Sequence, residues 1–427
     1  MMPMPTLPDA RTEKKNISVS LDDPDFRSAP TVFPLPGGPT EPEQFVLRRV
    51  GALTPDEFEA FERLAFEHGE YAESYLAIEP ERYCYLSADR QAAVSIVPAG
   101  RYLHIAGGIL AAPTRRPQMI TALAEHARRT GKVVAFYAVG EQDRPFFEAA
   151  GWEVSKFGED TDLDLNTLRW SGKPYEWVRR QFNFCQRAGL RSREIVPQEL
   201  SEDNWREVKI VLFEILREDL KDRVYSDEMG LLVGKLQPDN LGRRRLFVAE
   251  NEKTATIEGF LIVNPMRGGR GWAVESYRKR NSATRGAIPF LMKAAIDQLQ
   301  SEGAEHVSLC MLLFKDTANF ENNQSGGFLH WWLAFGQRIA DKLYSANGMI
   351  HFKTRFRPTL SNIYLCVTPK TSLFLTLSFL YHVGAFSFSL RNVAKSILRS
   401  LADRFTHRRT PGGTQPHEKT PVPLPAE

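Results

Sequence analysis

The chain has 427 residues, enough for two or more domains, and its 42% hydrophobic and 25% charged residues are typical of a globular protein. Its formal net charge of +3 is too small to indicate nucleic-acid binding by itself, so any anion site must come from a local cluster of cations. The four cysteines have neither metal-ligand spacing nor a disulfide pattern, which indicates a reducing, cytoplasmic environment.

Residues 1–44 are predicted to be a disordered Pro-rich leader, because nine prolines fall within the first 43 residues and no signal-peptide apolar run is present. Order is expected to begin at Phe45, and Thr54-Pro55 predicts the start of a helix. The next part of the chain predicts antiparallel strands, then a helix, a strand and a further helix. The strands are expected at 83–86, 92–96, 102–105 and 133–137, and the helices at 116–129 and 143–151.

The stretch from Lys156 to Gly189 combines an acidic strand with a basic helix. Alternation puts the carboxylates of Asp160, Asp162 and Asp164 on one face of a strand. With no histidine or fourth ligand nearby, a solvated face is expected there and not a metal site. The sequence Ser171-Gly172-Lys173-Pro174 then predicts a helix start. This helix has a basic face and an apolar stripe: Arg179, Asn183 and Arg187 on the first, and Val178, Phe182 and Cys185 on the second.

The same cycle of elements recurs after Pro197. It predicts helices at 204–220 and 287–302 and strands at 246–249, 259–263, 271–275 and 306–309. The sequence therefore predicts an α/β (α+β) protein with tandem N-acetyltransferase-like domains, at 45–190 and 191–370, and a basic helix between them. The turn at 278–286, before the second of these helices, has four cations but one glycine. This argues against an acetyl-CoA pyrophosphate loop and leaves another anionic partner open.

Two later stretches also point to anionic or lipid partners. In 348–358, an extended chain would place His351, Lys353, Arg355 and Arg357 on one face, either to hold a phosphate or to protect an edge strand. The twenty residues 371–390 contain no Asp, Glu, Lys or Arg, but serines and threonines dilute them. This segment is therefore expected to lie on a membrane surface rather than to cross the membrane. The alternative is that it packs on the rest of the protein.

Basic residues are frequent from 391 to 409, after the apolar stretch, which suits binding to an anionic membrane surface. Residues 410–427 are predicted to be a disordered tail. The pair Trp331-Trp332 could be part of the core or an anchor at a membrane interface.

The ordered motifs over about 71–369 resemble the C-terminal synthase domain of phosphatidylglycerol lysyltransferases, the multiple peptide resistance factors. In the first half, the motif positions are Lys156, Gly158, Glu159, Asp164, Leu165, Ser171, Gly172, Lys173, Arg179 and Asn183. Glu275, Arg278 and Gly286 match a later motif, with glutamate in place of the usual aspartate. The segment Cys310 to Phe314 departs from the family pattern, which puts the amino-acid or lipid specificity in doubt.

The resemblance implies transfer of an aminoacyl group from aminoacyl-tRNA to a phospholipid or another polar lipid, with no cofactor and no metal. Glu275 is the candidate for proton transfer or for holding the donor's α-ammonium, with Arg278 and Lys353 as electrostatic partners. The candidate substrate-binding residues are Asp164, Lys173, Arg179, Asn183, Gly286, Arg355 and Arg357.

Two other functions remain open: an acyltransferase that makes an amine-containing lipid from another acyl donor, and a non-catalytic module that binds lipid or RNA. A cytoplasmic location at the inner face of the cell membrane is expected, and the sequence does not indicate the oligomeric state.

Overall fold

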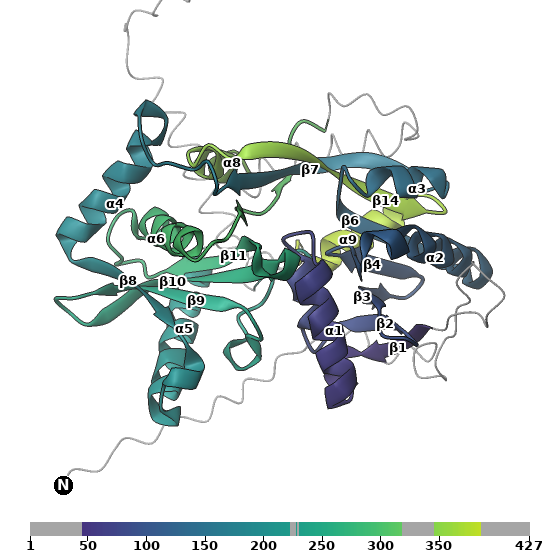
Figure 1. Cartoon of the computed structure of the whole chain (residues 1–427), viewed down its shortest axis with the longest axis horizontal. Coiled ribbons are helices and arrows are strands. Elements are labelled where there is room, and N and C mark those ends of the chain that lie inside the picture. Colours follow the sequence, from purple (N-terminus) through teal and green to yellow (C-terminus); the bar gives the residue numbers. More distant parts are fainter. Residues whose placement is uncertain (1–44, 223–227, 229, 318–345, 386–427) are drawn as a thin grey trace, which may run out of the picture.

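The computed structural model describes residues 45–222, 228, 230–317 and 346–385. The leader expected at 1–44, the pair Trp331-Trp332, the basic residues from 391 to 409 and the tail at 410–427 lie outside these residues. Within them the protein is a mixed α/β structure, as predicted (Figure 1).

The first half contains the expected antiparallel strands, followed by a helix and a strand parallel to the last of them. Its elements are β1 (Phe45–Arg49), η2 (Val50–Ala52), α1 (Pro55–His68), η3 (Ser74–Ile78), β2 (Tyr83–Ser87), β3 (Ala92–Ala99), β4 (Tyr102–Ala106), β5 (Ile109–Ala111), η4 (Pro113–Arg115), α2 (Arg116–Thr130), β6 (Val133–Gly140), α3 (Arg144–Ala149) and β7 (Glu153–Asp164). Thr54 caps α1 through the Glu57 backbone N–H, and the Glu57 carboxylate in return accepts from the Thr54 N–H. This reciprocal cap explains the predicted helix start.

The second half repeats the order, with β12 parallel to β11 after α6. Its elements are η5 (Lys173–Tyr175), α4 (Glu176–Ala188), β8 (Leu190–Ile195), η6 (Pro197–Glu199), α5 (Glu202–Asp222), η7 (Pro238–Asn240), β9 (Arg245–Asn251), β10 (Thr256–Met266), η8 (Arg267–Gly269), β11 (Gly271–Lys279), α6 (Ala287–Ser301), β12 (His306–Ser308), β13 (Leu312–Leu313), α8 (Ala346–Thr354), β14 (Thr359–Thr368) and α9 (Leu373–His382).

The two halves share one sheet. The strand order is β1-β2-β3-β4-β6-β14-β7-β12-β11-β10-β9-β8, with β5 beside β3 and β13 beside β7. The long strand β7 runs across the molecule and pairs with β12 of the second half (Figure 1). Strand β14 comes from the range expected in the second domain, but it lies between β6 and β7 of the first half. Strands β7 and β14 therefore connect the two halves.

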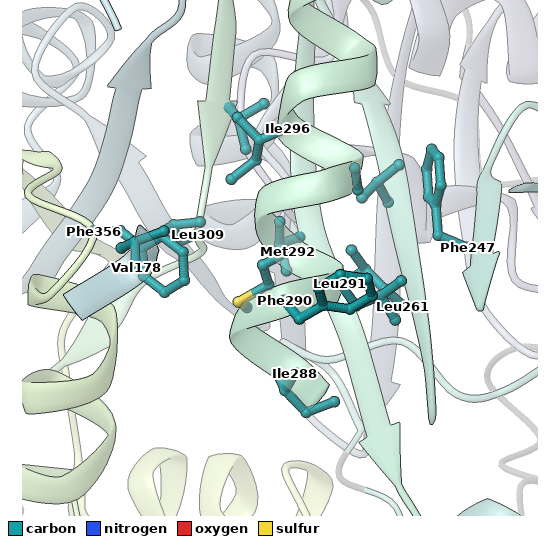
Figure 2. Packing of buried hydrophobic residues seen from close by; sticks show 14 of the residues in the cluster. Val178, Phe247, Leu261, Ile288, Phe290, Leu291, Met292, Ile296, Leu309 and Phe356 are labelled. Carbon is teal, nitrogen blue, oxygen red and sulfur yellow. The ribbon is translucent and has the colours of Figure 1, made fainter. Parts of the chain in front are cut away.

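The basic helix α4 packs against α6. Val178 and Cys185 are buried, and the Phe182 ring stacks on Phe290 with 5.0 Å between ring centroids. Figure 2 shows Val178 beside Leu309 and Phe356, on one side of α6, and all of these residues belong to one buried cluster. The predicted apolar stripe is confirmed, and its burial joins α4 to the second half. Each large apolar side chain buried in this way stabilises the fold by about 1.5–3 kcal/mol.

The strand expected at 348–358 is wrong, because Ala346–Thr354 forms the helix α8. Alternating apolar and basic residues suggested a strand. In the helix and the turn after it, Phe352 and Phe356 instead face the same aromatic cluster, with 5.8 Å between their ring centroids. Tertiary packing of these two rings thus outweighs the local alternation.

Helix α9 accounts for the first part of the apolar stretch. Leu375 and Phe379 are buried, and Phe379 stacks on Tyr137 at 4.6 Å, so one face packs on the first half of the sheet. Four apolar side chains on the rest of the helix are exposed: Leu373, Phe374, Leu377 and Tyr381. None of the described helices is both long enough and apolar enough to cross a membrane.

Candidate active site

A β-bulge places Glu275 at the junction of the two halves. Ser276 pairs with Ile262 and Val274 pairs with Val263, so the register between β10 and β11 skips Glu275. A bulged residue leaves the regular alternation of a strand and can redirect its side chain. The Glu275 carboxylate accepts hydrogen bonds from the Gly234 N–H at 2.6 Å and from Asn264 Nδ2 at 3.2 Å.

The environment of Glu275 suits proton transfer near neutral pH. Burial raises the pKa of this carboxyl to about 7, although the Gly234 N–H and the Arg244 guanidinium act in the opposite direction. Arg244 reaches the site through Asn264, whose amide oxygen accepts from Arg244 Nε at 2.9 Å. A carboxyl with a pKa near the working pH can both take up and return a proton.

Lys353 lies at the end of α8 and is only 4% exposed. Its Nζ donates to the backbone oxygens of Cys310 and Met311, both at 3.1 Å. Burial lowers the pKa of this ammonium, whereas the nearby Asp160, Glu73 and Glu275 raise it. The sequence predicted that Lys353 lies on a strand, which is wrong, because it lies in the helix α8.

Two further carboxyl groups, the buried Glu73 and the partly exposed Asp160, interact electrostatically with Lys353. Glu73 directly precedes η3 and is 2% exposed, and burial together with Asp160 and Glu275 holds its pKa well above the usual value. Asp160 on β7 accepts from Ser308 Oγ at 2.9 Å, and burial raises its pKa also. The three alternating aspartates share a face as predicted, and all three are partly exposed.

The loop after β12 holds the oxygens that bind Lys353. Cys310 has φ +63°, a strained backbone conformation for a residue with a side chain. Thr161 Oγ1 donates to the Cys310 oxygen at 2.7 Å, and the Cys310 N–H donates to Ser308 Oγ at 2.9 Å. Burial raises the pKa of the Cys310 thiol well above its usual value, so this cysteine is not an activated nucleophile.

Cations on the other side of Glu275 already have partners. Arg82 Nε lies 2.8 Å from Glu79, and Arg82 also donates to the Leu231 oxygen at 3.0 Å. Besides Asn264, Arg244 donates to the backbone oxygens of Tyr75 and Asn240. The segments at 75–82 and 231–244 are thus tied together beside the carboxyl cluster.

The predicted catalytic residue Arg278 contacts helix α5. Its Nε is 3.3 Å from Asp219 on α5, and one of its terminal nitrogens donates to the Tyr277 oxygen. The hydrogen bonds of Glu275 instead go to Gly234 and Asn264. The proposed catalytic role of Arg278 stays a prediction.

Several predicted substrate-binding residues gather around α4 and α8. Arg179 donates to the backbone oxygens of Trp170 and Gly172, at 2.9 and 2.8 Å, and so fixes the loop before α4. The Arg355 guanidinium lies 4.7 Å from the centre of the Trp177 ring. The other three of these candidates are exposed: Lys173, Asn183 and Arg357.

Asp164 lies in a turn at the end of β7, where it accepts from the Asn166 N–H and from Thr167 Oγ1, both at 3.0 Å. These bonds, that of Thr167 first, lower its pKa. The structure therefore shows a local capping contact for Asp164, and its role in substrate binding remains a prediction.

Gly286 precedes α6 with φ +89°, and a side chain there would meet Gln181 of α4. Close approach of α4 and the left-handed backbone together explain the glycine. The Glu258 carboxylate accepts from the Thr284 N–H at 2.6 Å, and Arg280 pairs with Glu214 and Glu218 of α5. Carboxylates of the chain itself thus occupy the Thr284 N–H and the Arg280 guanidinium of this loop.

Reasoning from the sequence missed Glu73, Asp160 and Cys310 as parts of one site. Asp160 was visible in the alternation of β7, but its position beside Lys353 depends on the fold of the whole chain. Glu73 precedes no recognisable motif, so no local signal could have identified it. Within the described residues, no group of three or more His, Cys, Asp and Glu side chains is arranged to hold a metal ion.

The comparisons with known proteins agree with this architecture. Residues 61–367 match the family model of the phosphatidylglycerol lysyltransferase C-terminal domain. The chain belongs to this family.

Curated relatives include a phosphatidylglycerol lysyltransferase of Bacillus subtilis, 24% identical over 322 residues, which cover 74% of this chain and 36% of that protein. A lysylphosphatidylglycerol biosynthesis bifunctional protein LysX of a Mycobacterium species is 26% identical over 220 residues, 47% of this chain and 19% of that protein. The chain thus spans about a third or less of the length of these relatives.

Solved structures show the same fold. The structure of L-PGS from Bacillus licheniformis has a TM-score of 0.64 at 21% identity, covering 78% of this chain and 98% of that one. A C-terminal domain ascribed to a lysylphosphatidylglycerol synthetase of Agrobacterium fabrum has a TM-score of 0.63 at 17% identity, covering 76% and 94%.

Proposed function

We propose that the protein transfers an aminoacyl group from aminoacyl-tRNA to the headgroup of a phospholipid, as the names of its relatives suggest for the acceptor. One observation carries the proposal: Glu275, with a pKa of about 7, lies at the junction of the halves close to the buried cation Lys353. Together, these two residues supply a proton acceptor and a positive charge within one site.

In the proposed reaction, a headgroup hydroxyl attacks the carbonyl carbon of the aminoacyl ester while Glu275 takes the hydroxyl proton. A new ester bond forms, and the bond to the 3′ oxygen of the tRNA breaks. Glu275 then returns the proton to that leaving oxygen, so no oxidant, metal or cofactor is needed. The positive charge of Lys353 favours the developing oxyanion.

The loop before α6 supports a donor other than acyl-CoA. A pyrophosphate would need free N–H groups there, whereas the Glu258 carboxylate accepts from the Thr284 N–H and Gln181 of α4 lies against Gly286. An exposed Phe184 and the exposed cations Lys173, Arg180 and Arg187 near or on α4 suit an RNA, because bases stack on aromatic rings beside a basic surface.

Helix α9 supports contact with a membrane surface. Its exposed side chains include Phe374 at 69% and Tyr381 at 48%, and this apolar surface lies on the helix that also packs on the sheet. Such a face buries its side chains at the boundary of headgroups and acyl chains. We place the protein at the cytoplasmic face of the membrane, where its lipid substrate is found.

Purified protein with charged tRNA and anionic liposomes should produce a new lipid that carries an amino acid, detected by mass spectrometry. Treatment with RNase before the reaction should prevent it. Activity with acyl-CoA and none with charged tRNA would instead support the alternative acyltransferase. Liposome binding without any new lipid would support the non-catalytic module.

A further inference from the structure

Asn264 connects the proposed proton acceptor to a buried cation. It lies on β10 and is 0% exposed. Its Nδ2 donates to Glu275 Oε2 at 3.2 Å, and its Oδ1 accepts from Arg244 Nε at 2.9 Å. Both ends of this buried amide are therefore bonded. Turning the amide over would place its donor against the arginine and its acceptor against the carboxylate, so one orientation is favoured.

Arg244 determines which way the Asn264 amide faces. An arginine N–H can only donate, so the amide atom next to it must be the oxygen, and the NH2 group must face Glu275. Arg244 is 8% exposed and also donates to the backbone oxygens of Tyr75 and Asn240, at 3.3 and 3.2 Å. The guanidinium thus binds oxygens from three separate segments, and these bonds hold it in place.

The bulge in β11 brings Glu275 to this amide. Glu275 is the residue that the register between β10 and β11 skips, and Asn264 lies on β10 within two residues of that point. The other oxygen of the carboxylate, Oε1, accepts from the Gly234 N–H at 2.6 Å. Each oxygen of Glu275 therefore has a donor directed at it. Hydrogen bonds of this kind stabilise the ionised carboxylate more than the protonated carboxyl group.

We propose that Asn264 is a positioning residue for the transfer: with its orientation set by Arg244, it holds Glu275 ionised and aimed to accept the headgroup proton. The inference rests on the proposed role of Glu275 in the reaction. Burial raises the pKa of this carboxyl to about 7, and the donors to its two oxygens oppose a further rise. Without Asn264, fewer molecules would have an ionised Glu275 at neutral pH, and transfer would be slower.

Other charged and titratable groups also act on Glu275. Arg244 and Arg82 favour its ionised form, whereas Glu79 opposes it. A substitution at Asn264 leaves these side chains in the protein, so a change in the titration of Glu275 reports the change at Asn264. Three further groups interact with Glu275 across the junction of the halves: Glu73, Cys310 and Lys353.

Asn264→Asp tests the inference most directly. It keeps the size of the side chain and an acceptor for Arg244, but it replaces the donor to Glu275 with a negative oxygen. A purely structural tie between Asn264 and Arg244 would survive this change. We expect the inflection of kcat/KM against pH to move upward from about 7 by at least about one pH unit. Transfer at pH 6 should then fall at least about tenfold, and the loss should shrink to a few-fold at pH 8.5.

Asn264→Ala is a second variant, which removes the donor without adding a charge. Its inflection should still rise, by about half a pH unit or more. If Asn264→Asp does not fold, Asn264→Ala decides the outcome. Asn251→Asp is the matched control, because Asn251 Nδ2 donates to the Glu258 carboxylate at 2.8 Å in the same kind of contact. This control should leave the inflection at about 7.

Carbon-13 NMR of protein labelled at the glutamate carboxyl carbons measures the titration of Glu275 without any substrate. The signal is assigned by its absence in Glu275→Gln. We expect its midpoint to rise in both Asn264 variants. If it rises but charged tRNA gives no lipid product, the proposed reaction fails while the positioning of Glu275 stands. The inference is overturned if the midpoint is unchanged in a folded Asn264 variant, or if Asn251→Asp moves it as far.

Discussion

At the scale of single residues, the site combines groups whose positions have different local origins. Glu275 is displaced by a bulge in a strand, whereas Lys353 ends a helix and donates to two backbone oxygens. Because Glu275 is proposed to transfer the proton and Lys353 to stabilise the oxyanion, substitutions at the two residues should affect the kinetics differently.

The pH dependence of the reaction should follow Glu275. It must be ionised to accept a proton, and its pKa is about 7, so kcat/KM should fall up to about tenfold per pH unit below 7 and level off above it. Glu275→Gln should lower the rate by at least about a hundredfold and remove this dependence. Rates between pH 5.5 and 8 measure both effects, and an unchanged pH profile in the variant would assign the proton transfer elsewhere.

Lys353 and Arg357 should differ because one is buried and the other is exposed. Lys353→Met keeps most of the side-chain volume, and it should lower kcat at least about tenfold, a loss of about 1.4 kcal/mol of transition-state stabilisation. Arg357→Ala should mainly weaken liposome binding at raised salt, since exposed charges are screened over about 10 Å. Kinetics at saturating lipid separates these effects. If both variants changed only binding, Lys353 would have no catalytic role.

At the scale of elements, α9 has one apolar face on the protein and another exposed. Phe374→Ser should weaken flotation with anionic liposomes, because about 2 kcal/mol of apolar burial in the membrane surface would be lost. It should leave the fold unchanged, since Phe374 is 69% exposed.

Phe184→Ser is the matched control for α9. Phe184 is 47% exposed but lies on α4, whose basic surface we propose for RNA. Liposome flotation should be unaffected by this change. Equal loss of flotation in both variants would show that α9 is not the membrane contact.

At the scale of the whole molecule, Glu70 joins the halves. Its carboxylate lies 3.2 Å from Arg116 of the first half and 2.9 Å from Arg267 of the second. Arg116 is buried and also contacts Asp143, which accepts from the Tyr71 hydroxyl at 2.5 Å. Removing the Arg116 charge would leave Asp143 buried without its cation.

Arg116→Met should lower the free energy of unfolding by about 3 kcal/mol, because it breaks a buried ion pair from one side. Arg267→Ala should cost no more than about 1 kcal/mol, since its side chain is 34% exposed and its ion pair is screened by water. Urea unfolding of both variants measures the difference. Equal losses would mean that the network does not depend on burial of Arg116.

Local patterns in the sequence were sufficient for features that depend on neighbours in the chain. The alternation of Asp160, Asp162 and Asp164, the cap at Thr54 and the stripe of Val178, Phe182 and Cys185 all appear as predicted. So does the order of strands and helices in each half, apart from the helix α8, because periodicity and capping act over a few residues.

Only the tertiary structure decided which distant segments meet. The insertion of β14 between β6 and β7 and the bulge at Glu275 depend on pairing between strands. The burial of Lys353 in a helix, and its position beside Glu73 and Asp160, depend on packing of segments more than 180 residues apart. Glu73 and Lys353 are buried because these distant segments, once packed together, remove water from around both charges.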